Sequence, residues 1–196
     1  MAAQGPLIVG IGGTTGGGSS TEAALRIALA AAEARGARTL MFGGEAIAAL
    51  PHYDPKSPTR APGEAALVAA VREASGLILA SPGYHGNVSG VVKNALDLLE
   101  ETARDARPYL TDLPVGLIAT AYGWQATGST IAALRAIVHA FRGWPTPFAA
   151  AVNCRLSRFD GNGAPSDPEV AEHLALVGRQ VADFALRPPV SLDIAS

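Results

Sequence analysis

The sequence predicts an α/β fold in which helices cover both faces of one parallel, five-stranded β-sheet. Short apolar runs, typical of strands buried on both faces, alternate with longer segments whose apolar residues recur at helical spacing. Such alternation predicts parallel strands joined by helical crossovers. Of the 196 residues, 48% are hydrophobic and 16% are charged, which is enough apolar material for one domain with a substantial core.

Five segments fit buried strands because they are short, apolar and bounded by glycine, proline or polar residues. They are residues 7–11, 39–42, 76–80, 113–120 and 148–152. Five helices are expected between and after them: one that Gly36 ends, then residues 64–75, 89–102 and 129–141, and a last one that runs to about Leu186. A capping box, Ser166-Asp167-Pro168-Glu169, opens the last helix.

Two segments fit neither strand nor helix. Residues 43–63 contain Pro51, Pro55, Pro58 and Pro62, and are therefore expected to be mostly irregular. The tail at residues 187–196 includes the prolines that end the last helix and is expected to be loose. Because the chain contains no internal repeat and no linker, we expect a single domain over residues 1–196, with its core at about residues 6–186.

Five strands in this alternation predict a flavodoxin-like three-layer sandwich with the strand order 2-1-3-4-5. In that order the connections reverse direction between strands 1 and 3, and ligands bind there, outside the carboxyl ends of the strands. The loops after strands 1, 3 and 4 all contain glycine and would lie side by side at this edge. The sequence therefore predicts a ligand site built from three loops.

Composition and charge exclude several classes of protein. The formal net charge of −2 offers no basic field for nucleic acid or an anionic membrane surface. The single cysteine, Cys154, cannot form an internal disulfide, and the four histidines lack the spacing of a metal site. There is no run of 18 apolar residues and no secretory signal. We therefore expect a cytoplasmic protein without a metal, nucleic-acid or membrane partner.

The loop after the first strand, residues 12–21, is rich in glycine and hydroxyl groups and precedes a helix. Backbone N–H groups and the dipole at a helix start favour a phosphate, which would be bound by Thr14, Ser19, Ser20 and Thr21. The loop lacks the lysine of a nucleotide triphosphate site and the third glycine of a dinucleotide site. A phosphate monoester such as that of FMN fits it, and the alternative is helix capping by Ser19 and Glu22 alone.

The loop after the third strand begins a stretch, residues 81–97, that reads SPGYHGNVSGVVKNALD. This stretch resembles the NADPH-dependent FMN reductase family, which has a similar pattern from S-P-E-Y to K-N-A-L-D. The first loop and residues 50–54, LPHYD, are similar to the same family, and the resemblance extends over about residues 6–186. Two positions depart from the family pattern: Gly16 stands where arginine is frequent, and Gly83 where glutamate is usual. The lost guanidinium weakens the expected binding of a phosphate.

The resemblance implies FMN as the bound cofactor and NADPH or NADH as the reductant. It assigns Ser19, Thr14 and Thr21 to the FMN phosphate, Pro82, Gly83, Tyr84 and His85 to the ring and ribityl chain, and Thr120, Tyr122 and Gly123 to the other edge of the ring. Hydride transfer to a flavin needs no obligatory acid–base residue. His85 is the loop histidine placed to assist a proton, and a hydrogen bond to the ribityl chain or backbone is its alternative role. Trp124 would stack near the nicotinamide or fill a dimer contact.

The expected function is therefore that of an FMN-dependent NAD(P)H oxidoreductase that reduces free flavin, a quinone, an azo compound or a metal oxyanion. Three alternatives stay open: a tailoring enzyme that uses FMN on a dedicated metabolite, a flavodoxin-type electron carrier, and a phosphate-ester-binding module without redox chemistry. Electron carriers of that type usually bear a strongly acidic surface, which a net charge of −2 does not provide.

The helix expected at residues 89–102 predicts a homodimer, or a dimer of such dimers. On a helical wheel, one apolar stripe (Val92, Leu96 and Leu99) would face the sheet. A second stripe lies beside it and consists of Val91, Ala95, Leu98 and Thr102. The two stripes together make an apolar face wider than one contact with the sheet would bury, so the second stripe would be exposed in a monomer. The alternative is that this second stripe packs beneath the chain's own final helix.

Overall fold

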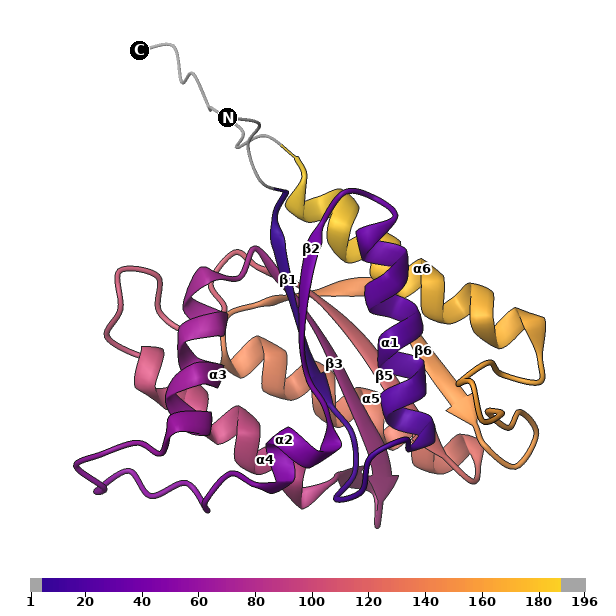
Figure 1. Cartoon of the computed structure of the whole chain (residues 1–196), viewed down its shortest axis with the longest axis horizontal. Helices are drawn as coiled ribbons and strands as arrows, with labels where there is room; N and C mark the ends of the chain where they lie inside the picture. Colours follow the sequence, from indigo (N-terminus) through magenta and orange to yellow (C-terminus); the bar gives the residue numbers. More distant parts are fainter. Residues whose placement is uncertain (1–4, 188–196) are drawn as a thin grey trace.

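The computed structural model describes residues 5–187 and shows a parallel sheet between two layers of helices (Figure 1). The parallel strands are β1 (Leu7–Gly12), β2 (Arg38–Phe42), β3 (Gly76–Tyr84), β5 (Pro114–Ala121) and β6 (Trp144–Asn153), in the order β2-β1-β3-β5-β6. A short strand, β4 (Asn87–Val88), pairs antiparallel with the end of β3. The predicted order 2-1-3-4-5 is confirmed, because β4 stands outside the parallel series. Apart from Arg187, the predicted loose tail lies outside the described residues.

The helices divide between the two faces of the sheet (Figure 1). One face is covered by α1 (Ser20–Glu33) and α6 (Pro168–Ala185). The other is covered by α3 (Pro62–Glu73), α4 (Gly90–Asp97), a 3₁₀ helix (Leu98–Thr102) and α5 (Trp124–Ala140). A short helix, α2 (Gly44–Ala48), follows β2. Among residues 5–187, no helix has the length and apolar character needed to cross a membrane.

Each strand sends alternate side chains into two separate cores. In β1, Ile8 belongs to the core beneath α1 and α6, whereas Val9 belongs to the core beneath α3, α4 and α5. Two strand positions beneath α6, Gly76 and Gly116, are glycine, and a Cβ on Gly116 would lie only 2.6 Å from a side-chain carbon of Val177. The small residues on this face therefore let the helices lie close to the sheet, and substitution there would force the packing apart.

Three strand and helix boundaries differ from those predicted. The expected loop at residues 81–90 is largely ordered, because β3 continues to Tyr84 and turns back into β4. Helix α5 begins at Trp124, five residues before the predicted start, and β6 begins at Trp144, four residues early. The prolines within β6 are tolerated because β6 is an edge strand, where N–H groups on the outer side need no partner in the sheet.

Two helix ends also correct the prediction. Asp167, and not Ser166, caps α6 by accepting a hydrogen bond from the N–H of Glu169 at 2.9 Å. Ser166 is held instead in the preceding loop, where it pairs with the backbone of Arg158. The helix predicted over residues 89–102 tightens into a 3₁₀ helix from Leu98 onward.

The second stripe of the helical wheel is not exposed. Ala95 and Leu98 are 0% exposed and Thr102 is 1% exposed, while Val91 is half-buried. Ala95 and Leu98 belong to the same buried cluster as Val71 of α3. The wheel argument for a dimer is therefore wrong: the stripe packs within the chain itself. It does so on the α3 side, and not beneath α6, which lies on the opposite face of the sheet.

Replacing Leu98 with glutamate is expected to prevent cooperative folding, because a carboxylate would be buried without a partner. The milder Leu98→Ala should lower the free energy of unfolding by about 2–5 kcal/mol, measured by urea denaturation. Ala66→Glu, at an exposed position on α3, is the matched control and should have little effect. If Leu98→Glu instead stays folded and changes the protein from a dimer to a monomer, residue 98 contacts a partner and the original argument for a dimer is restored.

Candidate functional site

The loops that follow β1, β3 and β5 meet at one edge of the sheet, toward the lower part of Figure 1 where β3 ends. The strand register brings these ends together, since Gly12 lies beside Ala80 and Pro82 lies beside Thr120. The predicted site residues thereby come from three separate loops into one region. This is the carboxyl edge of the sheet, where parallel α/β folds bind their ligands.

The first loop forms an open cradle of backbone N–H groups. Gly18 has a φ of +72°, a left-handed conformation that favours glycine, and the oxygen of Ser19 caps α1 by accepting from the N–H of Glu22 at 3.2 Å. No hydrogen bond within residues 5–187 uses the N–H groups of residues 17–21. A Cβ on Gly16 or Gly18 would meet no atom within 4 Å. Free N–H groups at an accessible helix start fit a phosphate monoester such as that of FMN.

The carboxylate of Glu22 points away from this cradle. Glu22 is buried, and its Oε2 accepts from the N–H of Gly44 at 3.3 Å, at the start of α2. Its Oε1 accepts from Nη2 of Arg26 at 2.6 Å. Thr14 is occupied within the loop, where its hydroxyl donates to the carbonyl of Gly16 at 3.2 Å. The acidic residue that follows the loop thus fixes α1 to α2 and leaves the N–H groups clear.

Thr21 and Thr120 are paired with each other. Their hydroxyl oxygens lie 2.6 Å apart and share a hydrogen bond, and the two residues are only 1% and 3% exposed. The structure therefore gives them a role that the sequence did not reveal, which is to join the first loop to the third. A direct contact of either hydroxyl with a flavin stays a prediction.

The second loop is a β-hairpin whose tip is exposed. His85 and Gly86 have φ values of +49° and +85°, as in a type I′ turn. Pro82 is buried, whereas Tyr84 and His85 are exposed. Ser81, which the sequence analysis did not single out, anchors the hairpin: its buried hydroxyl donates to the carbonyl of Pro82 at 2.9 Å and accepts from the N–H of Ser89 at 3.0 Å. The turn signal His85-Gly86 between two apolar runs could have indicated the hairpin.

Gly83 is required by the packing of this hairpin against α5. A Cβ at this position would lie 2.6 Å from Oγ1 of Thr130 and 3.0 Å from the carbonyl oxygen of Ala126. The hydroxyl of Thr130 also donates to the carbonyl of Ala126 at 2.8 Å, so neither atom is free to move. A glutamate at position 83 would therefore collide with the first turns of α5.

Three aromatic side chains surround this edge in exposed positions. Tyr84 is 53% exposed, Tyr122 is 75% exposed and Trp124 is 60% exposed. Gly123 separates the latter two and is the N-cap of α5, with an extended backbone. Large exposed aromatic residues beside a loop cluster are typical of surfaces that bind planar ligands.

Comparison with known proteins agrees with this geometry. The pattern of the NADPH-dependent FMN reductase family matches residues 6–155. The chain belongs to this family. The expectations of an oxidoreductase and of FMN and NAD(P)H as its cofactors are confirmed at the level of the family. The FMN-dependent NADPH-azoreductase of Staphylococcus aureus is 33% identical over 115 residues, which are 58% of this chain and 57% of that relative.

Solved structures with the same fold include three oxidoreductases. One from Corynebacterium diphtheriae has a TM-score of 0.70 at 18% identity and covers 93% of this chain and 98% of its own. An NADH:FMN oxidoreductase in its apo form has a TM-score of 0.70 at 22% identity, and the match covers 92% of this chain and 89% of that protein. The NAD(P)H:acceptor oxidoreductase of Paracoccus denitrificans has a TM-score of 0.69 at 19% identity, and the match covers 92% of this chain and 97% of that protein. At these identities the likeness shows the fold alone.

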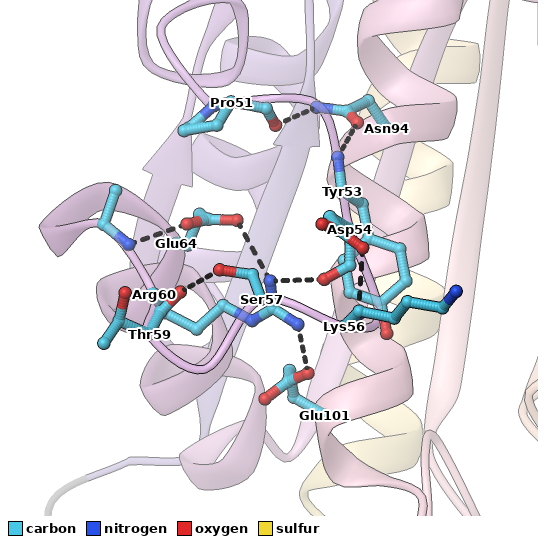
Figure 2. A network of polar contacts seen from close by, with 11 residues as sticks. Pro51, Tyr53, Asp54, Lys56, Ser57, Thr59, Arg60, Glu64, Asn94 and Glu101 are labelled. Atoms are coloured by element: carbon cyan, nitrogen blue, oxygen red, sulfur yellow. Dashed lines mark hydrogen bonds and ion pairs between the residues drawn. The ribbon is translucent and has the colours of Figure 1, made fainter.

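The family-like segment LPHYD is attached to α4 by one side chain. Asn94 donates from its amide to the carbonyl of Pro51 at 2.9 Å, and its Oδ1 accepts from the N–H of Tyr53 at 2.8 Å (Figure 2). Asn94 belongs to the other family-like stretch, KNALD. The two stretches are therefore in contact through Asn94, whose role the spacing of the sequence could not have shown.

Arg60 fixes the remainder of the proline-rich segment. Figure 2 shows its guanidinium between carboxylates and a backbone carbonyl: it donates to Oε1 of Glu101 at 2.8 Å and to the carbonyl of Asp54 at 3.0 Å, and lies 3.8 Å from Glu64. It also stacks 4.9 Å from the ring centre of Tyr53. Burial, followed by the charge of Glu101, raises the pKa of the Tyr53 hydroxyl, against the opposing charge of Arg60. The segment predicted to be mostly irregular, residues 43–63, contains α2 and the first residues of α3, and these contacts fix the part between the two helices without regular structure.

Gly83→Ala is expected to lower the free energy of unfolding by about 1–3 kcal/mol, because the added methyl group collides with α5. Urea denaturation measures this loss. Adding Thr130→Ala removes one of the two colliding atoms and should recover part of it. Gly90→Ala, where a Cβ meets nothing within 4 Å, is the control and should be nearly neutral. Equal stability of Gly83→Ala and the unchanged protein would refute the close approach.

Proposed function

We propose that this protein is an FMN-dependent NAD(P)H oxidoreductase that reduces small-molecule acceptors. The observation that carries the proposal is the group of unused N–H groups at residues 17–21 beside the hairpin and the exposed aromatic residues, in a chain of this family. The first loop would hold the phosphate, and the other two loops would hold the flavin ring. The named relative supports the proposal through little more than half of its length.

The chain's own residues would bind and orient the reactants. Ser19 would donate its hydroxyl hydrogen to the phosphate while its oxygen continues to cap α1. The hairpin backbone and Tyr122 would lie along the ring, and Trp124 would offer its face to the nicotinamide. When bound, FMN would supply the redox chemistry, which is hydride acceptance from NAD(P)H and two-electron reduction of the acceptor.

The proton that accompanies the second transfer would come from solvent or from His85, which lies at the exposed hairpin tip. Open access at this edge favours acceptors that bind transiently over one dedicated metabolite, with free flavin, a quinone or an azo compound as the candidates. The homodimer and the cytoplasmic location expected from the sequence stay predictions. Light scattering at micromolar concentration tests the dimer.

Reconstitution with flavin tests the proposal directly. The purified protein should take up FMN, seen by its visible spectrum, and should not take up FAD, because the short loop suits a terminal monoester. The loaded protein should oxidise NADPH or NADH beyond one equivalent per flavin only when an acceptor is present. An absence of flavin binding at micromolar concentration, or binding without oxidation of either nucleotide, would overturn the proposed function.

Ser19→Ala is expected to weaken FMN binding about 10- to 100-fold, because a hydrogen bond to a charged group contributes about 1.5–3 kcal/mol. The lost helix cap should also lower the free energy of unfolding by about 1 kcal/mol. Asp167→Ala, which removes the cap of α6 on a distant part of the chain, should lower stability without changing FMN affinity. If Ser19→Ala lowers stability alone, its role is capping and the phosphate contact is refuted.

A further inference from the structure

The first loop lacks a free positive charge of its own. Arg26, the basic residue nearest in α1, has its guanidinium in an ion pair with Glu22 at 2.6 Å. Glu45 of α2 lies against the loop, since a Cβ on Gly17 would be 2.8 Å from its Oε1. With Gly16 where the family often has arginine, the charged groups nearest the N–H groups are Glu45 and the ion pair of Arg26 with Glu22, whose carboxylate is turned toward α2. A further cation here would strengthen the binding of a doubly charged phosphate.

The segment after β6 lies beside this loop. Asn153 pairs with Ala121 in the sheet, and the N–H of Cys154 donates to the carbonyl of Ala121 at 2.8 Å. Cys154 packs against the buried cluster beneath α1 and α6, and a Cβ on Gly163, further along the same segment, would lie 3.5 Å from the side chain of Ala23 in the first turn of α1. The segment after β6 therefore runs between the end of β5 and the start of α1. Burial raises the pKa of the Cys154 thiol, so Cys154 is a packing residue rather than a thiolate.

A tight turn then fixes the backbone of the next residue. The side-chain Oδ1 of Asn153 accepts from the N–H of Arg155 at 3.1 Å. The carbonyl of Asn153 accepts from the N–H groups of Leu156 at 3.0 Å and Ser157 at 2.9 Å. Asn153 and Ser157 are buried, at 7% and 2% exposure, whereas Arg155 is exposed. The turn thus fixes the backbone of Arg155 two residues after the position that pairs with the end of β5, and leaves its side chain in solvent.

The guanidinium of Arg155 has no ion pair and no side-chain hydrogen bond within residues 5–187. Two other exposed arginines are engaged, since Arg35 pairs with Asp183 and Arg72 pairs with Asp105, whereas Arg158 in the same loop as Arg155 has no ion pair within the described residues. A guanidinium offers five donors in a planar fork that matches phosphate oxygens, and it stays charged at all physiological pH values.

We infer that Arg155 supplies the guanidinium that Gly16 does not, and that it binds a phosphate monoester at this edge. The inference rests on the proposed function and deepens it. Two phosphate monoesters could occupy the position, the 5′-phosphate of FMN and the 2′-phosphate of NADPH. Both phosphates are dianions of the same kind. Riboflavin is the comparison ligand that lacks the 5′-phosphate of FMN, and NADH is the one that lacks the 2′-phosphate of NADPH.

Binding measurements on Arg155→Gln test the inference. If Arg155 binds the FMN phosphate, FMN affinity falls roughly 10- to 100-fold while riboflavin affinity is unchanged, as measured by quenching of flavin fluorescence. If it binds the 2′-phosphate, the affinity of the apoprotein for 2′,5′-ADP falls by a similar factor while that for AMP is unchanged, as measured by calorimetry. Arg155→Lys, which keeps the charge without the fork, should restore part of either affinity.

Arg158→Gln is the matched control, because Arg158 is exposed in the same loop and also has no ion pair within the described residues. It should change none of these affinities. Equal FMN and 2′,5′-ADP affinities in Arg155→Gln and the unchanged protein would overturn the inference and leave the proposed function standing. So would an equal loss for riboflavin or AMP, which would indicate a general disturbance of the site. An unchanged protein that binds neither FMN nor riboflavin would overturn the proposed function and this inference together.

Discussion

Burial of the sheet on both faces is the constraint on which the rest of the structure depends. Helices α1 and α6 press onto strands that carry glycine beneath them, and α3, α4 and α5 close the opposite face. The interior of the sheet is therefore apolar, and glycine-rich or hydroxyl-rich segments are accommodated only at the strand ends. Because the strands are parallel, three such segments meet at a single edge. The location of the site follows from the packing of the sheet.

Hydrogen bonds between distant segments then give this edge its shape. Thr21 and Thr120 join the first loop to the third, and Ser81 joins the hairpin to the start of α4. Asn94 and Arg60 hold the proline-rich segment against the neighbouring helices. Thr21, Thr120 and Ser81 are buried, and their hydroxyl groups are satisfied by these hydrogen bonds, whereas Asn94 and Arg60 are partly exposed. The three loops are thus fixed relative to one another by the chain itself, before any ligand contributes.

The charge of the site is distributed differently from the family pattern. A glycine stands at position 16, Glu22 is turned toward α2, and Arg26 is neutralised by Glu22. The guanidinium that we infer for the phosphate belongs to Arg155, in the turn after β6 and far away in the sequence. Gly83 departs from the pattern for a reason of packing, because α5 approaches the hairpin too closely for any side chain. The first departure leaves the loop without an arginine at position 16, and the second preserves the fit of the hairpin against α5.

The sequence by itself determined the alternation of strands and helices, the strand order and the loops that form the site, because buried strands and amphipathic helices leave strong periodic signals. Its family-like stretches also indicated the cofactor class. Only the tertiary structure decided where the elements end: α5 begins at Trp124 and β3 continues to Tyr84, where Gly83 of β3 packs against Ala126 and Thr130 of α5. It also decided that Leu98 is buried against α3 and is not exposed to a partner. A helical wheel shows which residues share a face, but what covers that face depends on residues that lie far apart along the chain.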